Sequence, residues 1–171
     1  MISKKTAAIA ILALATSATS IAETQVIAHR GHWDQPGAAQ NSIRAIVKAD
    51  SIGCYGSEFD VWMTADSVLV VNHDPTVNNI HIATSDARTI LTQKLSNGEN
   101  IPALEQYLDT AAMLSTRLIF ELKSHPTRQQ EQQAVLKSLS MIEEKGLSDR
   151  TEYIVFSKDA MLDFIKYAPA G

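Results

Sequence analysis

The sequence has little cysteine, no surplus of basic residues and no long hydrophobic run. Its single cysteine, Cys54, excludes an internal disulfide, so no disulfide framework holds this fold together. Fifteen Lys and Arg against nineteen Asp and Glu, a formal net charge of −4, argue against a nucleic-acid-binding protein, which normally has a basic surplus. With 45% hydrophobic and 20% charged residues, the composition excludes a disordered tail, a collagen-like repeat and a multi-span membrane protein. The length of 171 residues indicates one globular domain.

The first residues have the layout of a secretory signal peptide. Lys4 and Lys5 form a basic start, an apolar run covers residues 6–15, and small residues lead to a cleavage site after Ala22. The apolar run is too short to span a bilayer. We therefore expect residues 1–22 to be removed, no stable membrane span to remain, and residues 23–171 to be exported as a periplasmic or secreted protein. The alternative is an uncleaved anchor or a misassigned start.

Short apolar runs alternate with helical patterns along the rest of the chain. Strands are predicted at 26–28, 57–63, 68–71, 118–123 and 153–156. Helices are predicted at 41–52, from Pro102 onward, between the capping residues Thr127 and Gln130 and the terminating Gly146, and at 160–167. Strands that alternate with helices indicate βα units and a parallel sheet. Residues 74–101 are polar with only a hint of a short helix near Ser85, which is typical of a functional loop.

Carboxylates lie within two of the predicted strands. Because side chains alternate along a strand, Glu58 and Asp60 share one face, and Glu121 and Lys123 share one face of another strand. The opposite faces are apolar and suit a layer of helices, so the carboxylates point to an interior where charge is costly unless paired or metal-bound. Oxygen ligands favour Ca²⁺ or Mg²⁺ over zinc. Ion pairs with Lys123 or Arg30 would also neutralise them, and the spacing leaves both alternatives open.

Two histidines follow predicted strands. His29 and His73 each stand at the carboxyl end of a strand, the end at which active sites form in parallel α/β barrels. Two imidazoles beside a metal site can serve as general acid and general base. Arg30 offers a planar fork for a phosphate, and Gly31 allows a tight turn. The other histidines are expected to be structural: His32, His81 and His125.

Five blocks, in this order and at these spacings, resemble the glycerophosphodiester phosphodiesterase family. They are His29-Arg30-Gly31, Asn41-Ser42, Gly56 to Val61, Val70 to Asp74, and Phe120 to Lys123. The resemblance runs from about Val26 to the C-terminus. It implies a (β/α)₈ TIM-type barrel and a metal-dependent hydrolase that cuts glycerophosphodiesters, as small-molecule substrates, to glycerol 3-phosphate and an alcohol. The residues implied by similarity are the acid–base pair His29 and His73, the ligands Glu58, Asp60 and Glu121 of a divalent cation (Ca²⁺ or Mg²⁺), and the phosphate-binding residues Arg30 and Lys123.

The sequence departs from the family pattern in two places. Where the family commonly has Pro-Glu-Asn-Thr, this chain has Ala39-Gln40-Asn41-Ser42, a change that bears on substrate choice rather than on the class of reaction. A complete barrel takes about 250 residues, so we expect an α/β barrel truncated after about five βα units, with residues 23–171 as its N-terminal part. The alternatives are a truncated, non-catalytic remnant and a related phospholipid phosphodiesterase on the same barrel.

Overall fold

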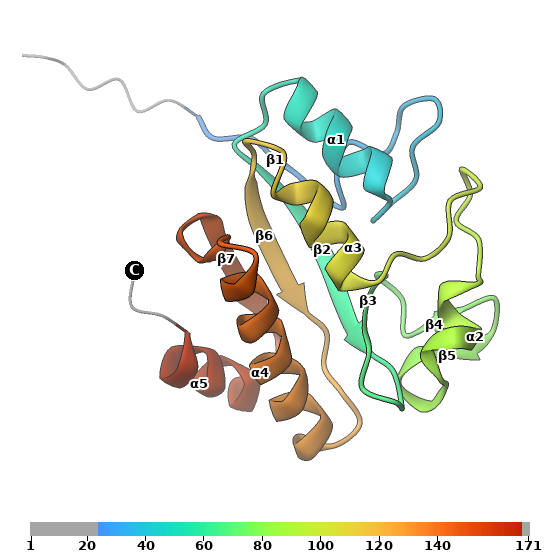
Figure 1. Ribbon diagram of the computed structural model, residues 1–171, viewed down its shortest axis with the longest axis vertical. Coiled ribbons are helices and arrows are strands. Elements are labelled where there is room, and N and C mark those ends of the chain that lie inside the picture. Colours follow the sequence, from blue (N-terminus) through green and yellow to red (C-terminus); the bar gives the residue numbers. More distant parts are fainter. Residues whose placement is uncertain (1–23, 169–171) are drawn as a thin grey trace, which may run out of the picture.

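The computed structural model describes residues 24–168, and the predicted signal peptide lies outside them. A parallel sheet forms the centre of the fold (Figure 1), with its strands in sequence order. These strands are β1 (Ile27–Ala28), β2 (Gly56–Met63), β6 (Arg117–Leu122) and β7 (Thr151–Val155). The expected α/β class is confirmed, because each parallel neighbour is reached through a helical connection.

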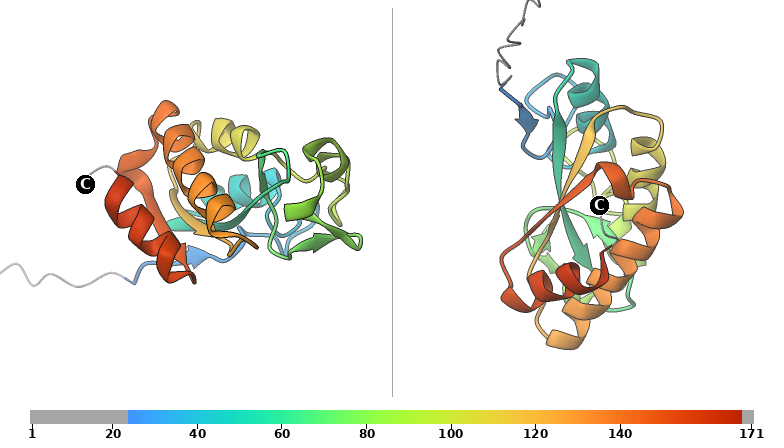
Figure 2. Two further views of the ribbon diagram at one scale, coloured as in Figure 1. Left: turned by 90° about the horizontal axis from the view of Figure 1, so that it is seen from below. Right: turned by 90° about the vertical axis from the view of Figure 1, so that its left-hand side faces the viewer.

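The helices that follow the strands cover one face of the sheet (Figures 1 and 2). They are α1 (Ile43–Ser51), α3 (Leu104–Ala111), α4 (Arg128–Glu144) and α5 (Lys158–Tyr167), with a short 3₁₀ turn, η2 (Ser148–Arg150), before β7. Phe59 and Phe120 of the sheet pack with Tyr107 of α3 and Phe164 of α5 in the main core. The apolar faces of β2 and β6 therefore meet the helices, as the alternation of residues predicts.

Side-chain caps explain where the helices begin. Ser42 caps α1 by accepting from the backbone N–H of Ala45, and Thr127 caps α4 by accepting from that of Gln130. The predicted start at Pro102 is wrong by two residues, since α3 begins at Leu104. The carbonyl of Pro102 instead accepts from the N–H of Val71, which keeps residues 102–103 extended beside the sheet.

The strand predicted at 68–71 is present as β3 (Leu69–Val71), but its direction differs from the expectation. It pairs antiparallel with β2, with Val71 opposite Val61, so it is the second strand of a hairpin and no part of a βα unit. The hairpin turn at residues 64–68 includes Ser67 with a φ of +65°. The chain therefore runs back along β2, and Asn72 donates its N–H to the carbonyl of Asp60 at 3.0 Å.

Residues 74–101 are more structured than the predicted loop. They form a small hairpin, the 3₁₀ turn η1 and a short helix, with bounds β4 (Thr76–Val77), β5 (Ile80–His81), η1 (Ile82–Thr84) and α2 (Ala87–Leu91). Ile82 and Ile90 form a second core with Trp62 of β2. We call residues 74–101, which lie between β3 and α3, the insertion. Glu99 joins its end to α1 by accepting the N–H of Ile43 at 3.1 Å.

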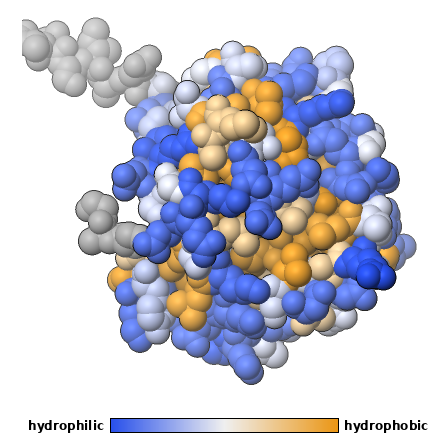
Figure 3. Space-filling model, in the orientation of Figure 1, coloured by the Kyte–Doolittle hydropathy of each residue, from blue (hydrophilic) through white to orange (hydrophobic). Residues whose placement is uncertain are grey.

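The surface on the helix side of the molecule mixes hydrophilic side chains with hydrophobic patches (Figure 3). Strand β7 lies at the edge of the sheet, and beside it Phe156 and Ile165 are 80% and 73% exposed. No helix within residues 24–168 combines the length and apolarity that crossing a membrane requires.

Candidate metal and phosphate site

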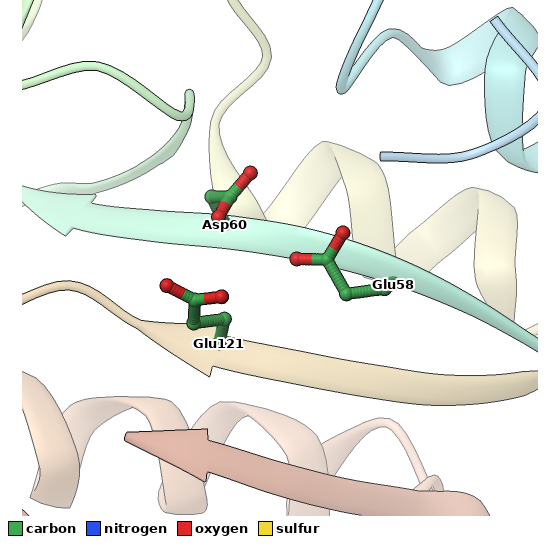
Figure 4. A group of neighbouring side chains, drawn as sticks. All are labelled: Glu58, Asp60 and Glu121. Atoms are coloured by element: carbon green, nitrogen blue, oxygen red, sulfur yellow. The ribbon is translucent and has the colours of Figure 1, made fainter. Parts of the chain in front are cut away.

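Three carboxylates converge on the face of the sheet opposite the helices (Figure 4). Glu58 and Asp60 come from β2 and Glu121 from β6, where Asp60 and Glu121 are paired in register. One ligand oxygen of each lies within 4.8 Å of those of the other two, and all three residues are buried. The pairing of β2 with β6 thus brings the predicted ligands together.

Lys123 forms the ion pairs that the sequence allows. Its Nζ lies 2.7 Å from Asp60 Oδ1 and 2.5 Å from Glu121 Oε1. Burial acts to lower the pKa of Lys123, but its hydrogen bonds to these two carboxylates outweigh that effect and the pKa is raised. Arg30 is farther away, with Nε 3.9 Å from Asp60 Oδ2. Two cations face three carboxylates, so ion pairing leaves negative charge in the cluster.

Neither Lys123 nor Arg30 forms an ion pair with Glu58, the third carboxylate of the cluster. Its Oε2 accepts the backbone N–H of Arg30 at 2.7 Å and lies 3.9 Å from His29 Nε2, while Oε1 is buried without a hydrogen-bond partner. Burial, then the charge of Asp60, raises the pKa of Glu58 to about 7. A buried, unpartnered carboxylate oxygen facing two further carboxylates fits a hard divalent cation. The residues present therefore suit the ion that the sequence predicts.

The His29-Arg30-Gly31 turn is shaped by backbone sterics. Arg30 and Gly31 have φ values of +59° and +76°, and the N–H of Gly31 donates to the carbonyl of Ala28. A Cβ at position 31 would stand 2.6 Å from Cβ of Ala45, so only glycine lets α1 approach. The turn leaves 70% of the His29 side chain exposed and directs Arg30 Nη1 to Gln40 Oε1 at 2.7 Å.

Asn41 holds Asp60 in place, a role that the sequence analysis missed. Its Nδ2 donates to Asp60 Oδ2 at 2.8 Å, and its Oδ1 accepts the backbone N–H of Asp60 at 3.1 Å. Asn41 has a φ of +61°, which asparagine tolerates better than most residues. The sequence showed only a polar residue before a helix, where capping is the usual explanation and where Ser42 is the actual cap.

His73 follows β3, the second strand of the β2–β3 hairpin. Its Nδ1 lies 2.8 Å from Asp74 Oδ1, and its backbone carbonyl accepts from Trp62 Nε1 at 3.2 Å. Within residues 24–168 it makes no hydrogen bond or ion pair to the three carboxylates, whereas His29 lies beside Glu58. Because a carboxylate only accepts, the contact with Asp74 fits a tautomer of His73 with its proton on Nδ1.

His125 is structural, as expected. Its Nε2 accepts the backbone N–H of Met63 at 2.9 Å, and its ring lies 5.5 Å from that of Trp62. Burial lowers its pKa. His125 therefore stays neutral and supports the Trp62 ring, which in turn holds the carbonyl of His73.

A parallel sheet with helices on one face and carboxylates on the other is the arrangement found in α/β barrels of the TIM type. The sequence profile of the glycerophosphoryl diester phosphodiesterase family matches residues 29–169, and the chain belongs to this family.

Relatives of known sequence or structure agree with this assignment. A glycerophosphodiester phosphodiesterase of Caldanaerobacter subterraneus is 29% identical over 164 residues, covering 86% of this chain and 64% of the relative. A glycerophosphodiester phosphodiesterase from Parabacteroides distasonis, known from a crystal structure, is 49% identical in sequence to this chain. The two structures align with a TM-score of 0.84, over 86% of this chain and 62% of the other. An Oleispira antarctica phosphodiesterase, solved with the product sn-glycerol-3-phosphate, shares the fold at 21% identity and a TM-score of 0.72, covering 84% and 62%. The chain thus spans less than two thirds of the length of each.

Proposed function

We propose that the protein hydrolyses glycerophosphodiesters to glycerol 3-phosphate and an alcohol, using a divalent cation. The observation that carries the proposal is the buried trio Glu58, Asp60 and Glu121 beside the basic residues Arg30 and Lys123. Family membership supports the reaction class, and the product bound to the Oleispira relative supports glycerol 3-phosphate as a product here.

The three carboxylates would hold Ca²⁺ or Mg²⁺, which supplies positive charge to the phosphate as the reaction proceeds. Lys123 keeps its own charge close to the same point because Asp60 and Glu121 fix its Nζ. Arg30 presents its guanidinium from the turn after β1, held by Gln40. Both side chains gather the negative charge that develops on the phosphate oxygens.

His29 and His73 would move the two protons of the reaction. One imidazole takes a proton from the attacking hydroxyl as the new P–O bond forms. The other gives a proton to the alcohol oxygen as its P–O bond breaks. Attack by water gives glycerol 3-phosphate directly, whereas attack by the substrate's own glycerol hydroxyl gives a cyclic phosphate that water then opens to glycerol 3-phosphate. The exposure of 70% of the His29 side chain and 36% of the His73 side chain leaves both accessible to a substrate.

The test of the acid–base role is His73→Ala. We expect this variant to bind Ca²⁺ as the wild-type protein does, because His73 contacts no carboxylate of the cluster, and to lose turnover of glycerophosphodiesters about 100-fold or more. The matched control is His81→Ala, which removes an exposed histidine of β5. Normal hydrolysis by His73→Ala would remove His73 from the mechanism.

Product analysis tests the substrate class. Release of water-soluble glycerol 3-phosphate supports the proposal, whereas a lipid product, or a cyclic phosphate that accumulates as the end product, would favour a phospholipid phosphodiesterase on the same barrel. Export is a separate proposal that rests on residues 1–22 of the sequence, and N-terminal sequencing of the secreted or periplasmic protein checks it.

A further inference from the structure

Gln40 is a neutral residue in contact with one of the two basic side chains of the site. Its Oε1 accepts a hydrogen bond of 2.7 Å from Nη1 of Arg30, whose side chain is 20% exposed. It also stands at one of the positions where the sequence departs from the family pattern. The contact gives a neutral amide direct influence on how Arg30 meets a phosphate.

The backbone on both sides of Gln40 is fixed by hydrogen bonds. Ala39 donates its N–H to Oγ of Ser42 at 3.2 Å, and Asn41 donates its N–H to the carbonyl of Arg30 at 3.0 Å. The side chain of Asn41 is itself bonded to the carboxylate cluster. Because an arginine side chain has many rotamers in solution, an amide placed in this way orients the guanidinium of Arg30.

The rest of the Arg30 guanidinium faces the carboxylate cluster. Its Nε lies 3.9 Å from Asp60 Oδ2 and is buried without a hydrogen-bond partner. Within residues 24–168, the bond to Gln40 is the one hydrogen bond that this side chain makes. Since a guanidinium carries five N–H donors, several remain for the oxygens of a phosphate.

The contact between Gln40 and Arg30 is accessible from solution. Gln40 lines a cavity of about 400 Å³, which also borders His73 at the end of the hairpin and Leu95 and Ser96 of the insertion. A small anion therefore has a route to Arg30 that does not cross the helix-covered side of the sheet.

The charges of the site decide what a neutral residue at position 40 means. Three carboxylates, with Glu58 ionised, face the two cations Arg30 and Lys123, so these five side chains carry a net charge of −1. A bound divalent cation changes that net charge to +1. A carboxylate at position 40 would return it to zero and pair with the arginine that is to meet the phosphate.

We propose that Gln40 is a positioning residue that orients Arg30 without cancelling its charge. The amide oxygen accepts the hydrogen bond as a carboxylate would, but it adds no negative charge. The cation-loaded site therefore keeps the positive charge that attracts an anionic phosphate. This role rests on the proposed hydrolysis, since it concerns the phosphate of that reaction, but binding measurements alone can test it.

The isosteric variant Gln40→Glu separates orientation from charge. It keeps an acceptor for Arg30 and adds one negative charge, so the affinities for a cation and for an anion should change in opposite directions. By calorimetry, we expect Ca²⁺ to bind roughly threefold more tightly, and glycerol 3-phosphate to bind the Ca²⁺-loaded protein roughly tenfold more weakly. Unchanged affinities, or weaker binding of both ligands by the folded variant, would overturn the inference.

The variant Gln40→Leu tests orientation without a change of charge, and it keeps the inference testable if Gln40→Glu does not fold. It removes the acceptor, so glycerol 3-phosphate should bind roughly tenfold more weakly while the Ca²⁺ affinity stays within about twofold. Wild-type affinity for glycerol 3-phosphate in Gln40→Leu would overturn the positioning role.

Gln133→Glu is the matched control for the added charge. Gln133 is exposed on α4, which lies on the face of the sheet opposite the carboxylates. The substitution adds the same negative charge far from Arg30, so both affinities should stay within about twofold of the wild-type values. Shifts equal to those of Gln40→Glu would mean that net charge, rather than the contact with Arg30, sets the affinities, and would overturn the inference.

Hydrolysis of glycerophosphocholine by the wild-type protein separates this inference from the proposed function. Opposite affinity shifts in Gln40→Glu, in a protein whose wild type hydrolyses no glycerophosphodiester, would support the role of Gln40 and contradict the proposed function. Unshifted affinities in Gln40→Glu, with a wild type that hydrolyses the diester, would overturn the role of Gln40 and support the proposed function. A wild-type protein that binds neither Ca²⁺ nor glycerol 3-phosphate would contradict both.

Discussion

Strands β2 and β7 belong to the same sheet but differ in how they are covered. Every residue of β2 is buried, whereas only the first residue of β7 is, and Phe59 is fully buried while Phe156, just after β7, is 80% exposed. Helices cover one side of β2, and the insertion at 74–101 covers Trp62 at its end. Two of the three carboxylates of the candidate site therefore lie on a fully buried strand, and none of the three comes from the exposed edge at β7 and α5.

Phenylalanine truncation gives the largest expected contrast between these regions. Phe59→Ala should lower the free energy of unfolding by about 3–5 kcal/mol, since it removes a ring packed against Tyr107 and Phe120. Phe156→Ala, on an exposed ring, should change it by less than about 0.5 kcal/mol. Urea denaturation measures both values, and equal losses would show that β7 is covered as closely as β2.

Glycine substitution tests the turn that carries His29 and Arg30. Gly31→Ala should cost about 3 kcal/mol of stability, because the new Cβ meets Ala45 in addition to the strain of a positive φ. Gly53→Ala is the matched control: its φ is +73° with open space around it, so strain alone should cost about 1 kcal/mol. Equal losses of stability at the two positions would mean that α1 moves away from the new Cβ, and that the close contact between Gly31 and Ala45 is not required.

Removing the Asn41 amide tests how Asp60 is held. Asn41→Ala leaves the buried N–H of Asp60 without an acceptor and should cost about 1–3 kcal/mol, together with weaker Ca²⁺ binding. Asn78→Ala removes another asparagine at positive φ, whose amide donates to Gln93 in a solvent-exposed hydrogen bond, and should leave Ca²⁺ affinity unchanged. The contrast fails if both variants bind Ca²⁺ like the wild type.

Cation affinity should depend on pH through Glu58. Its pKa of about 7, raised by burial and by Asp60, means that the metal-free carboxyl is protonated below that pH. A cation needs the carboxylate and must displace this proton, so Ca²⁺ affinity should fall by about tenfold per unit as the pH drops below 7 and level off above it. Calorimetric titrations between pH 5.5 and 8 measure the slope, and a flat profile would remove Glu58 from the ligand set.

Sequence reasoning located most elements because their signals are local. The caps Ser42 and Thr127 and the alternation in β2 and β6 each depend on a few neighbouring residues. The predicted direction of β3 was wrong because a run of apolar residues has the same pattern in a parallel and in an antiparallel strand. Strand pairing, a long-range property, decides it.

The same division holds for the site. Glu58, Asp60 and Glu121 were predicted from alternation and resemblance, and the register of β2 with β6 brings them together. Asn41 was missed because its contact with Asp60 joins residues 19 positions apart. The cavity beside His73 was missed because its walls come from three separated segments, two of them joined by Asn97 and Gly37.

Thermal unfolding with and without Ca²⁺ tests the central claim, that the carboxylates of β2 and β6 bind a hard cation. At about 100 times its dissociation constant, a cation adds roughly 2.7 kcal/mol to the folded state. We predict a cooperative melt that shifts upward with millimolar Ca²⁺ in the wild-type protein and no shift in Glu58→Ala. A wild-type melting temperature that does not change with Ca²⁺, or an equal upward shift in Glu58→Ala, would contradict the claim.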